Sequence, residues 1–175
     1  MRALLLALLF LLGCATTTPP LTPHGTKCMR VSEVYISTTL TGRERELVAR
    51  AAGAWMQATP ECFALTADRE TADLRVEKVY YRLGLAPVYP GWASAAGLYL
   101  AATHTIYLVS ENYSDDQKAT ILGHEFGHYL GLDHAHLGTG ESIVNPVLDQ
   151  DYQLVADGKI PQADVEAYWR LPRVP

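Results

Sequence analysis

Four of the six histidines in this 175-residue chain fall within thirteen positions, from His124 to His136. His124 and His128 are four residues apart in a segment whose apolar residues recur at helical spacing, so both imidazoles would project from one face of a helix. Gly131 then ends the helix and lets the chain turn back, which would bring His134 to the same point. This spacing predicts a single metal ion held by three histidines.

A site with three histidine ligands leaves one coordination position open, as catalytic zinc sites do. Zinc is the expected ion because tetrahedral sites rich in imidazole suit it. Glu125 follows the first ligand and would flank the ion without coordinating it, which is the position of a general base acting on a zinc-bound water. The sequence therefore predicts one catalytic Zn²⁺, with Glu125 as the catalytic residue and His124, His128 and His134 as metal ligands.

Five short segments have the pattern of strands. Their apolar residues alternate with polar ones or form short runs between turn residues. These segments span residues 31–38, 63–66, 74–80, 97–101 and 105–109. They predict a mixed sheet with helices packed against it.

Three helices are expected around these strands. Thr41 and Glu44 have the spacing of a capping box that opens the first helix. Ser114 begins a second capping box, at the start of the helix that carries the histidines. The two aspartates after Ser114 are favoured there by the helix dipole, and a calcium site is the alternative. A closing helix would begin near Pro161. Its apolar face would consist of Val165, Tyr168 and Trp169.

The first residues have the pattern of an export signal. Arg2 precedes an apolar run over residues 3–12, which as a helix is too short to span a hydrocarbon layer about 30 Å thick. The sequence Leu11-Leu12-Gly13-Cys14 resembles the lipobox of bacterial lipoproteins, in which the cysteine carries the lipid after cleavage. We therefore expect a signal peptide at residues 1–13 and a lipid on Cys14. The protein would be anchored to a membrane of the bacterial cell envelope, on its periplasmic or extracellular face.

The rest of the chain divides into a tether and one domain. Residues 14–29 are rich in Thr and Pro and lack an apolar period, so they predict a flexible tether. Residues 30–175 are enough for one compact domain. The net charge is −5 and no Lys/Arg block occurs, which argues against nucleic acid as a partner. We expect a monomer that contacts the membrane through its N-terminal lipid.

Two cysteines remain once Cys14 is assigned to the lipid. In an oxidising compartment an even pair favours a disulfide, here between Cys28 and Cys62. A free Cys28 acting as a zinc ligand is the alternative. The segment before the first strand is too short for a folded prodomain, so latency would require His24 or Cys28 to fold back onto the metal.

The segment from His124 to His134, HEFGHYLGLDH, resembles the zinc signature of the metzincin metallopeptidases, in particular their matrixin-like group. The order of the elements is similar over about residues 31–168. The resemblance implies an α+β fold with a twisted, mixed five-stranded sheet, a backing helix and an active-site helix. A small, irregular C-terminal subdomain ending in a helix would follow. The three histidines match the zinc ligands of the family by position, and Glu125 matches its general base.

Two further segments are similar to substrate-binding parts of that family. The edge strand beside the zinc, which pairs with an extended peptide, would consist of Gly97, Leu98, Tyr99 and Leu100. In the family, a tight turn beyond the third histidine places a methionine beneath the metal, and here Val144 stands at that position. Val144 can still supply an apolar floor, but we expect a weaker or more mobile site. The neighbouring wall of the specificity pocket would include Asn145 and Pro146.

These features together predict a metalloendopeptidase, a hydrolase that uses zinc to cleave peptide bonds in protein or peptide substrates. The alternative is a catalytically weak or inactive zinc-binding module that interacts with proteins on the cell envelope. Val144 and the short segment before the domain favour that alternative.

Overall fold

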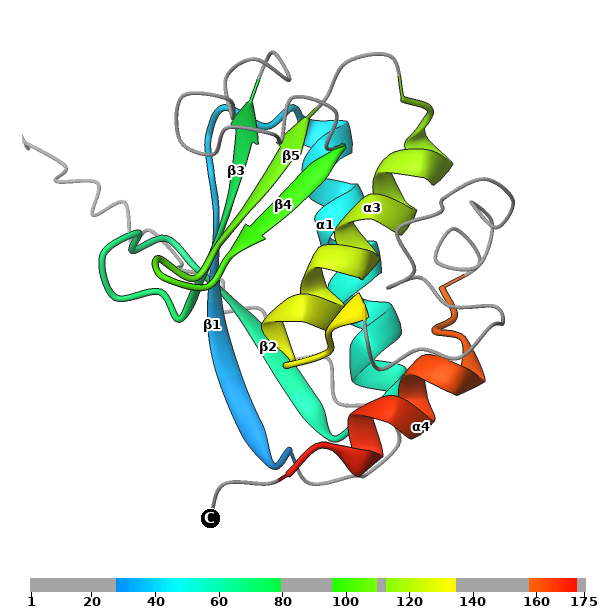
Figure 1. Cartoon of the computed structure of the whole chain (residues 1–175). Helices are drawn as coiled ribbons and strands as arrows, with labels where there is room; N and C mark the ends of the chain where they lie inside the picture. The colour runs from blue at the N-terminus through cyan, green and yellow to red at the C-terminus, as the bar shows by residue number, and fades with distance from the viewer. Residues whose placement is uncertain (1–27, 80–95, 110–112, 135–157, 173–175) are drawn as a thin grey trace, which may run out of the picture.

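The computed structural model describes residues 28–79, 96–109, 113–134 and 158–172 (Figure 1). The elements in chain order are β1 (Arg30–Ile36), α1 (Gly42–Ala58), β2 (Glu61–Thr66), β3 (Leu74–Val79), β4 (Gly97–Leu100), β5 (Thr105–Val109), α3 (Asp115–Tyr129) and α4 (Gln162–Arg170). Five strands and three helices are thus described, and the expected mixed sheet with packed helices is confirmed.

The sheet is mixed and has the order β2-β1-β3-β5-β4. β1 pairs in parallel with β2 and β3, β3 pairs in parallel with β5, and β4 pairs antiparallel with β5. In β1, Ser32 and Val34 are buried while Glu33 is exposed, as expected for a strand with one face on the core.

The strand order places β4 at one edge of the sheet, with only β5 beside it among the described strands.

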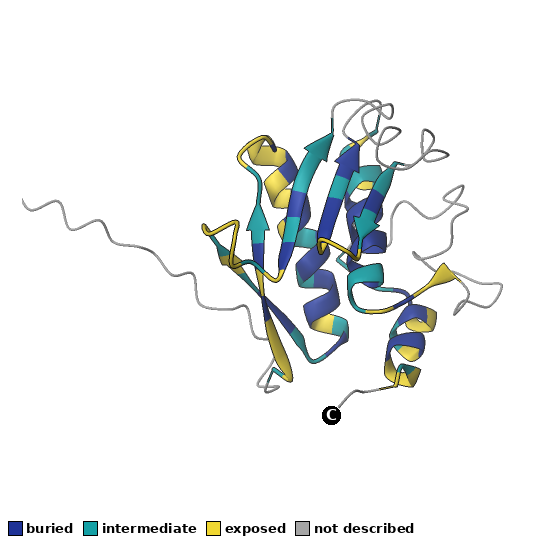
Figure 2. Cartoon of the chain, turned by 60° about the vertical axis from the view of Figure 1, so that its left-hand side comes forward, coloured by how far each residue is buried: buried dark blue, intermediate teal, exposed yellow. Residues whose placement is uncertain are grey.

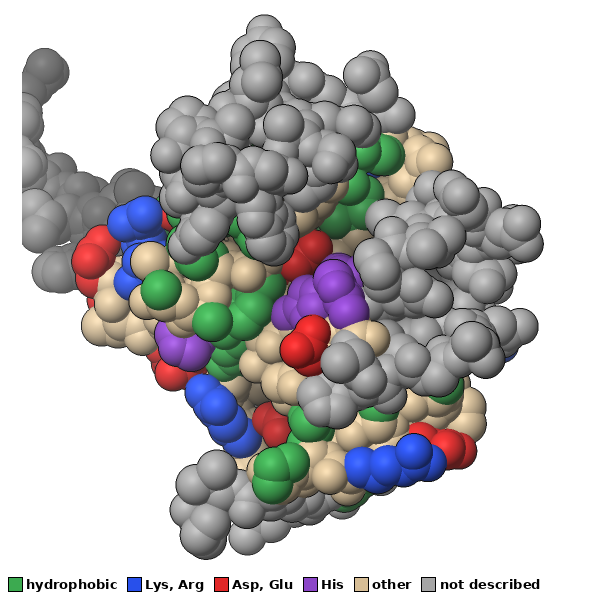
Figure 3. All heavy atoms as spheres, in the orientation of Figure 1, with side chains coloured by type: hydrophobic (Ala, Val, Ile, Leu, Met, Phe, Trp, Pro, Cys, Tyr) green, Lys and Arg blue, Asp and Glu red, His purple; other side chains and the backbone are tan. Residues whose placement is uncertain are grey.

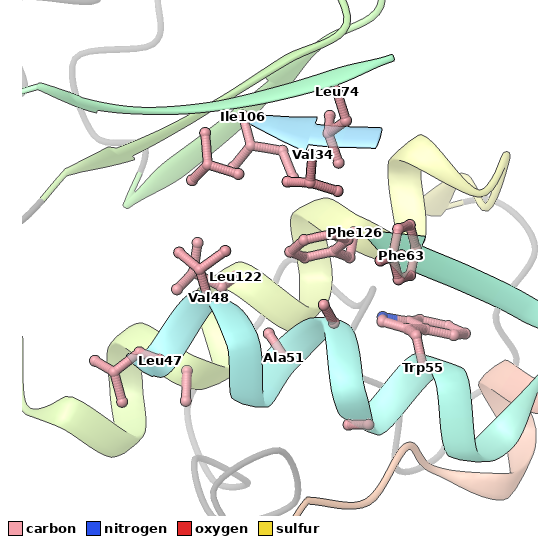
Figure 4. Close-up of a cluster of buried hydrophobic side chains, with 14 of the residues drawn as sticks. Val34, Leu47, Val48, Ala51, Trp55, Phe63, Leu74, Ile106, Leu122 and Phe126 are labelled. Atoms are coloured by element: carbon pink, nitrogen blue, oxygen red, sulfur yellow. The ribbon is translucent and has the colours of Figure 1, made fainter. Parts of the chain in front are cut away.

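The main core lies between one face of the sheet and the helices α1 and α3 (Figure 4). Val34, Leu74 and Ile106 of the sheet face Val48 of α1 and Phe126 of α3, and all five side chains are at most 1% exposed. The indole Nε1 of Trp55 in α1 donates a hydrogen bond of 2.8 Å to the carbonyl of Gly123 in α3. This contact fixes α3 against α1 directly before His124.

Both expected capping boxes are present. The Thr41 side chain accepts from the backbone N–H of Glu44, whose carboxylate accepts from the N–H of Thr41. Ser114 and Gln117 make the same reciprocal pair at the start of α3. Each box satisfies donors that a helix N-terminus leaves without an intrahelical partner. The two aspartates in the first turn of α3 lie where the helix dipole favours negative charge.

The closing helix α4 forms as expected, but its apolar face differs from the prediction. Tyr168 is buried and its hydroxyl donates to the Glu61 carboxylate at 2.6 Å, which attaches α4 to the start of β2. Val165 is only partly buried, and Trp169 is 48% exposed. The prediction for Trp169 was wrong because the buried face of α4 consists of Asp164, Ala167 and Tyr168, so Trp169 lies to one side of it. The mixture of buried and exposed colours on α4 shows this (Figure 2).

The expected disulfide between Cys28 and Cys62 is present, with the two Cα atoms 5.7 Å apart. The N–H of Met29 also bonds the carbonyl of Pro60 at 2.9 Å, so the start of the domain is tied to β2. None of the described helices is long and apolar enough to cross a membrane. The expectations for the signal peptide, for Cys14 and for most of the tether lie outside the described residues.

Candidate metal centre

The three histidines that the spacing singled out lie together at the end of α3. The Nε2 atom of His128 is 3.0 Å from that of His124 and 3.1 Å from that of His134, and the remaining pair is 3.2 Å apart. Figure 3 shows this group of histidine side chains near the middle of one face of the molecule. No other group of three or more His, Cys, Asp or Glu side chains with metal-binding spacing occurs in the described ranges.

A turn at Gly131 brings the third histidine to the first two. Gly131 has a φ of +95°, a conformation that side chains with a Cβ rarely adopt. The N–H of Gly131 bonds the carbonyl of His128, and the N–H of Leu132 bonds the carbonyl of Gly127, which closes the helix. The chain then doubles back so that His134 reaches the cluster, as the sequence predicted.

The turn also orients one of the imidazoles. Nδ1 of His128 lies 2.8 Å from the carbonyl oxygen of Leu132, so Nδ1 carries the proton and donates it. Nε2 of the neutral ring then presents its lone pair to the cluster, which is the form that binds a metal. Burial lowers the pKa of His128, and the neighbouring His134 lowers it further, although the Leu132 carbonyl opposes both.

The histidine geometry fits a zinc ion. Three nitrogens at 2.0–2.1 Å from zinc and at tetrahedral angles would be about 3.3 Å from one another. The observed separations of 3.0–3.2 Å are close to that value. The ligand set of three neutral nitrogens also suits zinc better than calcium or magnesium, which prefer oxygen.

Glu125 lies beside the histidine cluster and against β4. Its Oε1 atom is 4.0 Å from Nε2 of His124, and its Oε2 atom accepts a hydrogen bond of 2.6 Å from the backbone N–H of Tyr99. Burial raises the pKa of Glu125 to about 8, against the hydrogen bond from Tyr99, which lowers it. A cation bound by the histidines would favour the ionised carboxylate.

The residues expected to bind substrate lie in β4, but they face different ways. Gly97 and Tyr99 adjoin Glu125, whereas the Leu98 side chain is 4% exposed and packs with Val109 in a separate cluster. Leu98 therefore offers no side chain to a ligand at the metal centre. The expectations for Val144, Asn145 and Pro146 lie outside the described residues.

His104 lies outside the histidine cluster. It is exposed in the turn between β4 and β5, and its Nδ1 atom is 3.1 Å from the hydroxyl of Tyr99. Sequence reasoning did not anticipate this contact, nor the contacts of Gly97 and Tyr99 with Glu125. These contacts involve backbone atoms or a loop residue, and the residue types in a sequence do not predict such contacts.

No protein-family model and no curated protein matches the sequence. Among solved structures, the chain is similar to a structure of myroilysin, with 22% sequence identity and a TM-score of 0.47. The similarity covers 66% of this chain and 55% of that one. The chain thus spans only about half the length of the myroilysin chain.

Proposed function

We propose that this protein is a zinc-dependent endopeptidase of the metzincin type, with His124, His128 and His134 as zinc ligands and Glu125 as general base. The observation that carries the proposal is the convergence of the three Nε2 atoms to 3.0–3.2 Å, with a buried carboxylate 4.0 Å from one of them. Burying a carboxyl group costs free energy unless hydrogen bonds or a nearby cation compensate for the lost hydration. Oε2 of Glu125 accepts a hydrogen bond from the N–H of Tyr99, and its Oε1 atom faces the histidines.

When bound, zinc would polarise the scissile carbonyl and make a water molecule more acidic. The chain supplies the proton transfers. Oε1 of Glu125 faces the histidines and would accept the proton of the attacking water, while Oε2 stays on the N–H of Tyr99. Oε1 would then deliver that proton to the departing amine. The hydrogen bond from Tyr99 to Oε2 thus leaves Oε1 as the oxygen that transfers the proton.

β4 would hold the substrate backbone. The N–H of Tyr99 points away from β5 to Glu125, so the backbone groups of Gly97, two residues earlier, also point to the edge of the sheet. An extended peptide that adds to this edge would lie directly beside the metal centre, and its main chain rather than its side chains would be recognised. Proteins and peptides are therefore the proposed substrates.

Glu125→Gln tests the proposal because glutamine keeps the size of the side chain but is not a base. Zinc-loaded wild-type protein should cleave members of a peptide library, detected by mass spectrometry. The E125Q variant should bind one zinc per chain and cleave about 100-fold to 10,000-fold more slowly. A zinc-loaded wild type that cleaves nothing, or an E125Q variant with unchanged cleavage, would contradict the enzyme and favour the binding module.

We also propose that the protein is a lipoprotein of the bacterial cell envelope, anchored through Cys14. The disulfide between Cys28 and Cys62 supports a compartment outside the cytoplasm, because disulfides persist in oxidising surroundings. Cells that express the chain and are fed radiolabelled palmitate should label the wild type in the membrane fraction and not a Cys14→Ala variant. Equal labelling of the two proteins would contradict the anchor.

A further inference from the structure

The edge strand β4 approaches α3, at Ile121 and Glu125, so closely that only glycine fits at position 97. A Cβ atom built on Gly97 would lie 2.6 Å from Cγ2 of Ile121, 3.0 Å from Oε1 of Glu125 and 3.2 Å from its Cγ atom. The backbone of Gly97 does not have the positive φ that excludes other residues. The requirement for glycine therefore comes from space alone, because the side chains of Ile121 and Glu125, both on α3, occupy the place where a Cβ would lie.

Two residues after Gly97, the backbone of β4 forms a hydrogen bond with the other oxygen of the Glu125 carboxylate. The N–H of Tyr99 donates to Oε2 of Glu125 at 2.6 Å, a short bond of the kind that carboxylates form with backbone donors. Oε1 is left between Gly97 and Nε2 of His124. The carboxylate thus cannot turn about its last bond without losing the Tyr99 bond, and it cannot move towards β4 without striking Gly97.

The side chain of Tyr99 anchors this part of β4. Its hydroxyl is 3.1 Å from Nδ1 of His104, and its ring packs edge-on against Tyr129, with ring centroids 5.9 Å apart. Tyr129 lies one helical turn after Glu125 on α3, and its hydroxyl donates to Ser32 in β1 at 2.9 Å. β4 and α3 are therefore joined both at Glu125 and one turn beyond it.

We propose that Gly97 and Tyr99 are positioning residues, which set the orientation of the Glu125 carboxylate for proton transfer rather than bind the metal. Gly97 acts by leaving room for the carboxylate, and Tyr99 acts through its N–H, which its anchored ring keeps in place. This inference rests on the proposed function, since it concerns the general base of that reaction.

Gly97→Ala is the first test, and Gly53→Ala is its matched control. A Cβ at Gly53 in α1 would meet nothing within 4 Å, so G53A adds the same methyl group where there is space. G97A should bind one zinc per chain, with KM close to that of the wild type and kcat lower by about 100-fold, as expected for a catalytic group displaced by about 1 Å. G53A should keep both kcat and KM. A G97A variant with wild-type kcat would overturn the role of Gly97.

A second measurement does not depend on activity. In ¹H–¹⁵N NMR spectra of the zinc-loaded protein, the Tyr99 amide proton should lie far downfield and exchange slowly, because it is bound to a carboxylate. G97A and E125Q should both shift it upfield, and G53A should not. If the wild type cleaves nothing while the Tyr99 amide behaves in this way, the proposed function fails but the β4 contact stands. A Tyr99 amide that is unaffected by E125Q would overturn the contact itself.

The role of the Tyr99 side chain is tested by Tyr99→Ala. This variant also keeps the proposal testable if G97A does not fold. Y99A removes the ring contact with Tyr129 and should lower kcat about tenfold at unchanged zinc content. Tyr99→Phe keeps that contact and loses only the hydroxyl, so it should recover most of the kcat lost in Y99A. Equal kcat in wild type and Y99A would show that the side chain has no positioning role.

Discussion

Glu44 is buried and ionised, and it joins three parts of the molecule through one carboxylate. It accepts from the N–H of Thr41 at 2.9 Å, from Nζ of Lys78 in β3 at 3.0 Å and from Nζ of Lys118 in α3 at 3.4 Å. Burial alone would raise the pKa of Glu44, but the hydrogen bonds from Thr41 and Lys78 outweigh it and hold the pKa at about 2. The residue that caps α1 therefore also ties α1 to the sheet and to α3.

Glu44→Gln should lower the free energy of unfolding by about 3 kcal/mol at pH 7, because it leaves two partly buried lysines, Lys78 and Lys118, without their anionic partner. A folded pKa below the unfolded value means that the ionised Glu44 stabilises the fold above about pH 4.5. That contribution is lost as the pH falls towards 2. Urea denaturation should therefore show a difference between wild type and E44Q that is large at pH 7 and shrinks from pH 4.5 downwards.

Glu46→Gln is the control for this prediction, since Glu46 pairs with Arg43 at the surface and its side chain is 67% exposed. Surface pairs of this kind contribute little, so E46Q should unfold like the wild type. A difference between wild type and E44Q that does not change with pH would contradict the role assigned to the Glu44 charge.

The helix α3 and the turn that follows it form the metal centre as a unit. Two ligands depend on the helical spacing, and the third depends on the positive φ of Gly131. Gly158 has a φ of +73° as well, but it lies outside the metal centre and a Cβ there would meet nothing within 4 Å. The two glycines therefore allow backbone strain to be separated from damage to the site.

Gly131→Ala should destabilise the fold by about 1–2 kcal/mol through backbone strain and should also weaken zinc binding, because strain relief moves His134 away from the cluster. Gly158→Ala should lower stability by a similar amount and leave zinc affinity unchanged. Zinc affinity measured by competition with a chelator, together with urea denaturation, checks both statements. Equal zinc affinity in G131A and wild type would contradict the role of this turn.

Some features of these elements could be predicted from the sequence because their signals are local. The capping boxes at Thr41 and Ser114 and the stop at Gly131 depend on residues within one turn, and all three are present. The histidine cluster could also be predicted from the sequence. A spacing of four residues places two histidines on one face of a helix, and the turn at Gly131 brings His134 back to them.

Other features depend on which distant segments meet, and residue type does not reveal that. The approach of Gly97 to Glu125 requires β4 to be beside α3, and the pairing of Glu44 with Lys118 joins residues 74 positions apart. Trp169 shows the opposite error, because an aromatic residue at helical spacing suggested burial where the domain leaves it 48% exposed. Chain topology decides all three.

At the scale of the whole domain, the disulfide between Cys28 and Cys62 links the residues before β1 to β2, 34 positions further along the chain. The bond encloses β1 and α1, so it restricts the unfolded chain over the first part of the core. A double variant with both cysteines replaced by alanine should lose about 3–4 kcal/mol of unfolding free energy. Urea denaturation under oxidising conditions measures this, and a loss below about 1 kcal/mol would contradict the prediction.

The double variant should still fold around the core between the sheet, α1 and α3, because most of that core consists of other side chains, although Cys62 belongs to it and Cys28 packs against it. Its zinc content should remain one per chain, because the metal centre lies on α3 and the turn after it. A double variant that loses zinc while remaining folded would show that the disulfide supports the metal centre directly.

The zinc endopeptidase proposal is tested most directly by zinc titration of metal-free wild-type protein, with the rate of peptide cleavage as the readout. Cleavage should be absent without metal, rise in proportion to added zinc and reach its maximum at one zinc per chain, while E125Q takes up the same zinc and stays inactive. Saturation of the three histidines with zinc and no cleavage of any peptide would contradict the proposal, as would cleavage that persists without the metal.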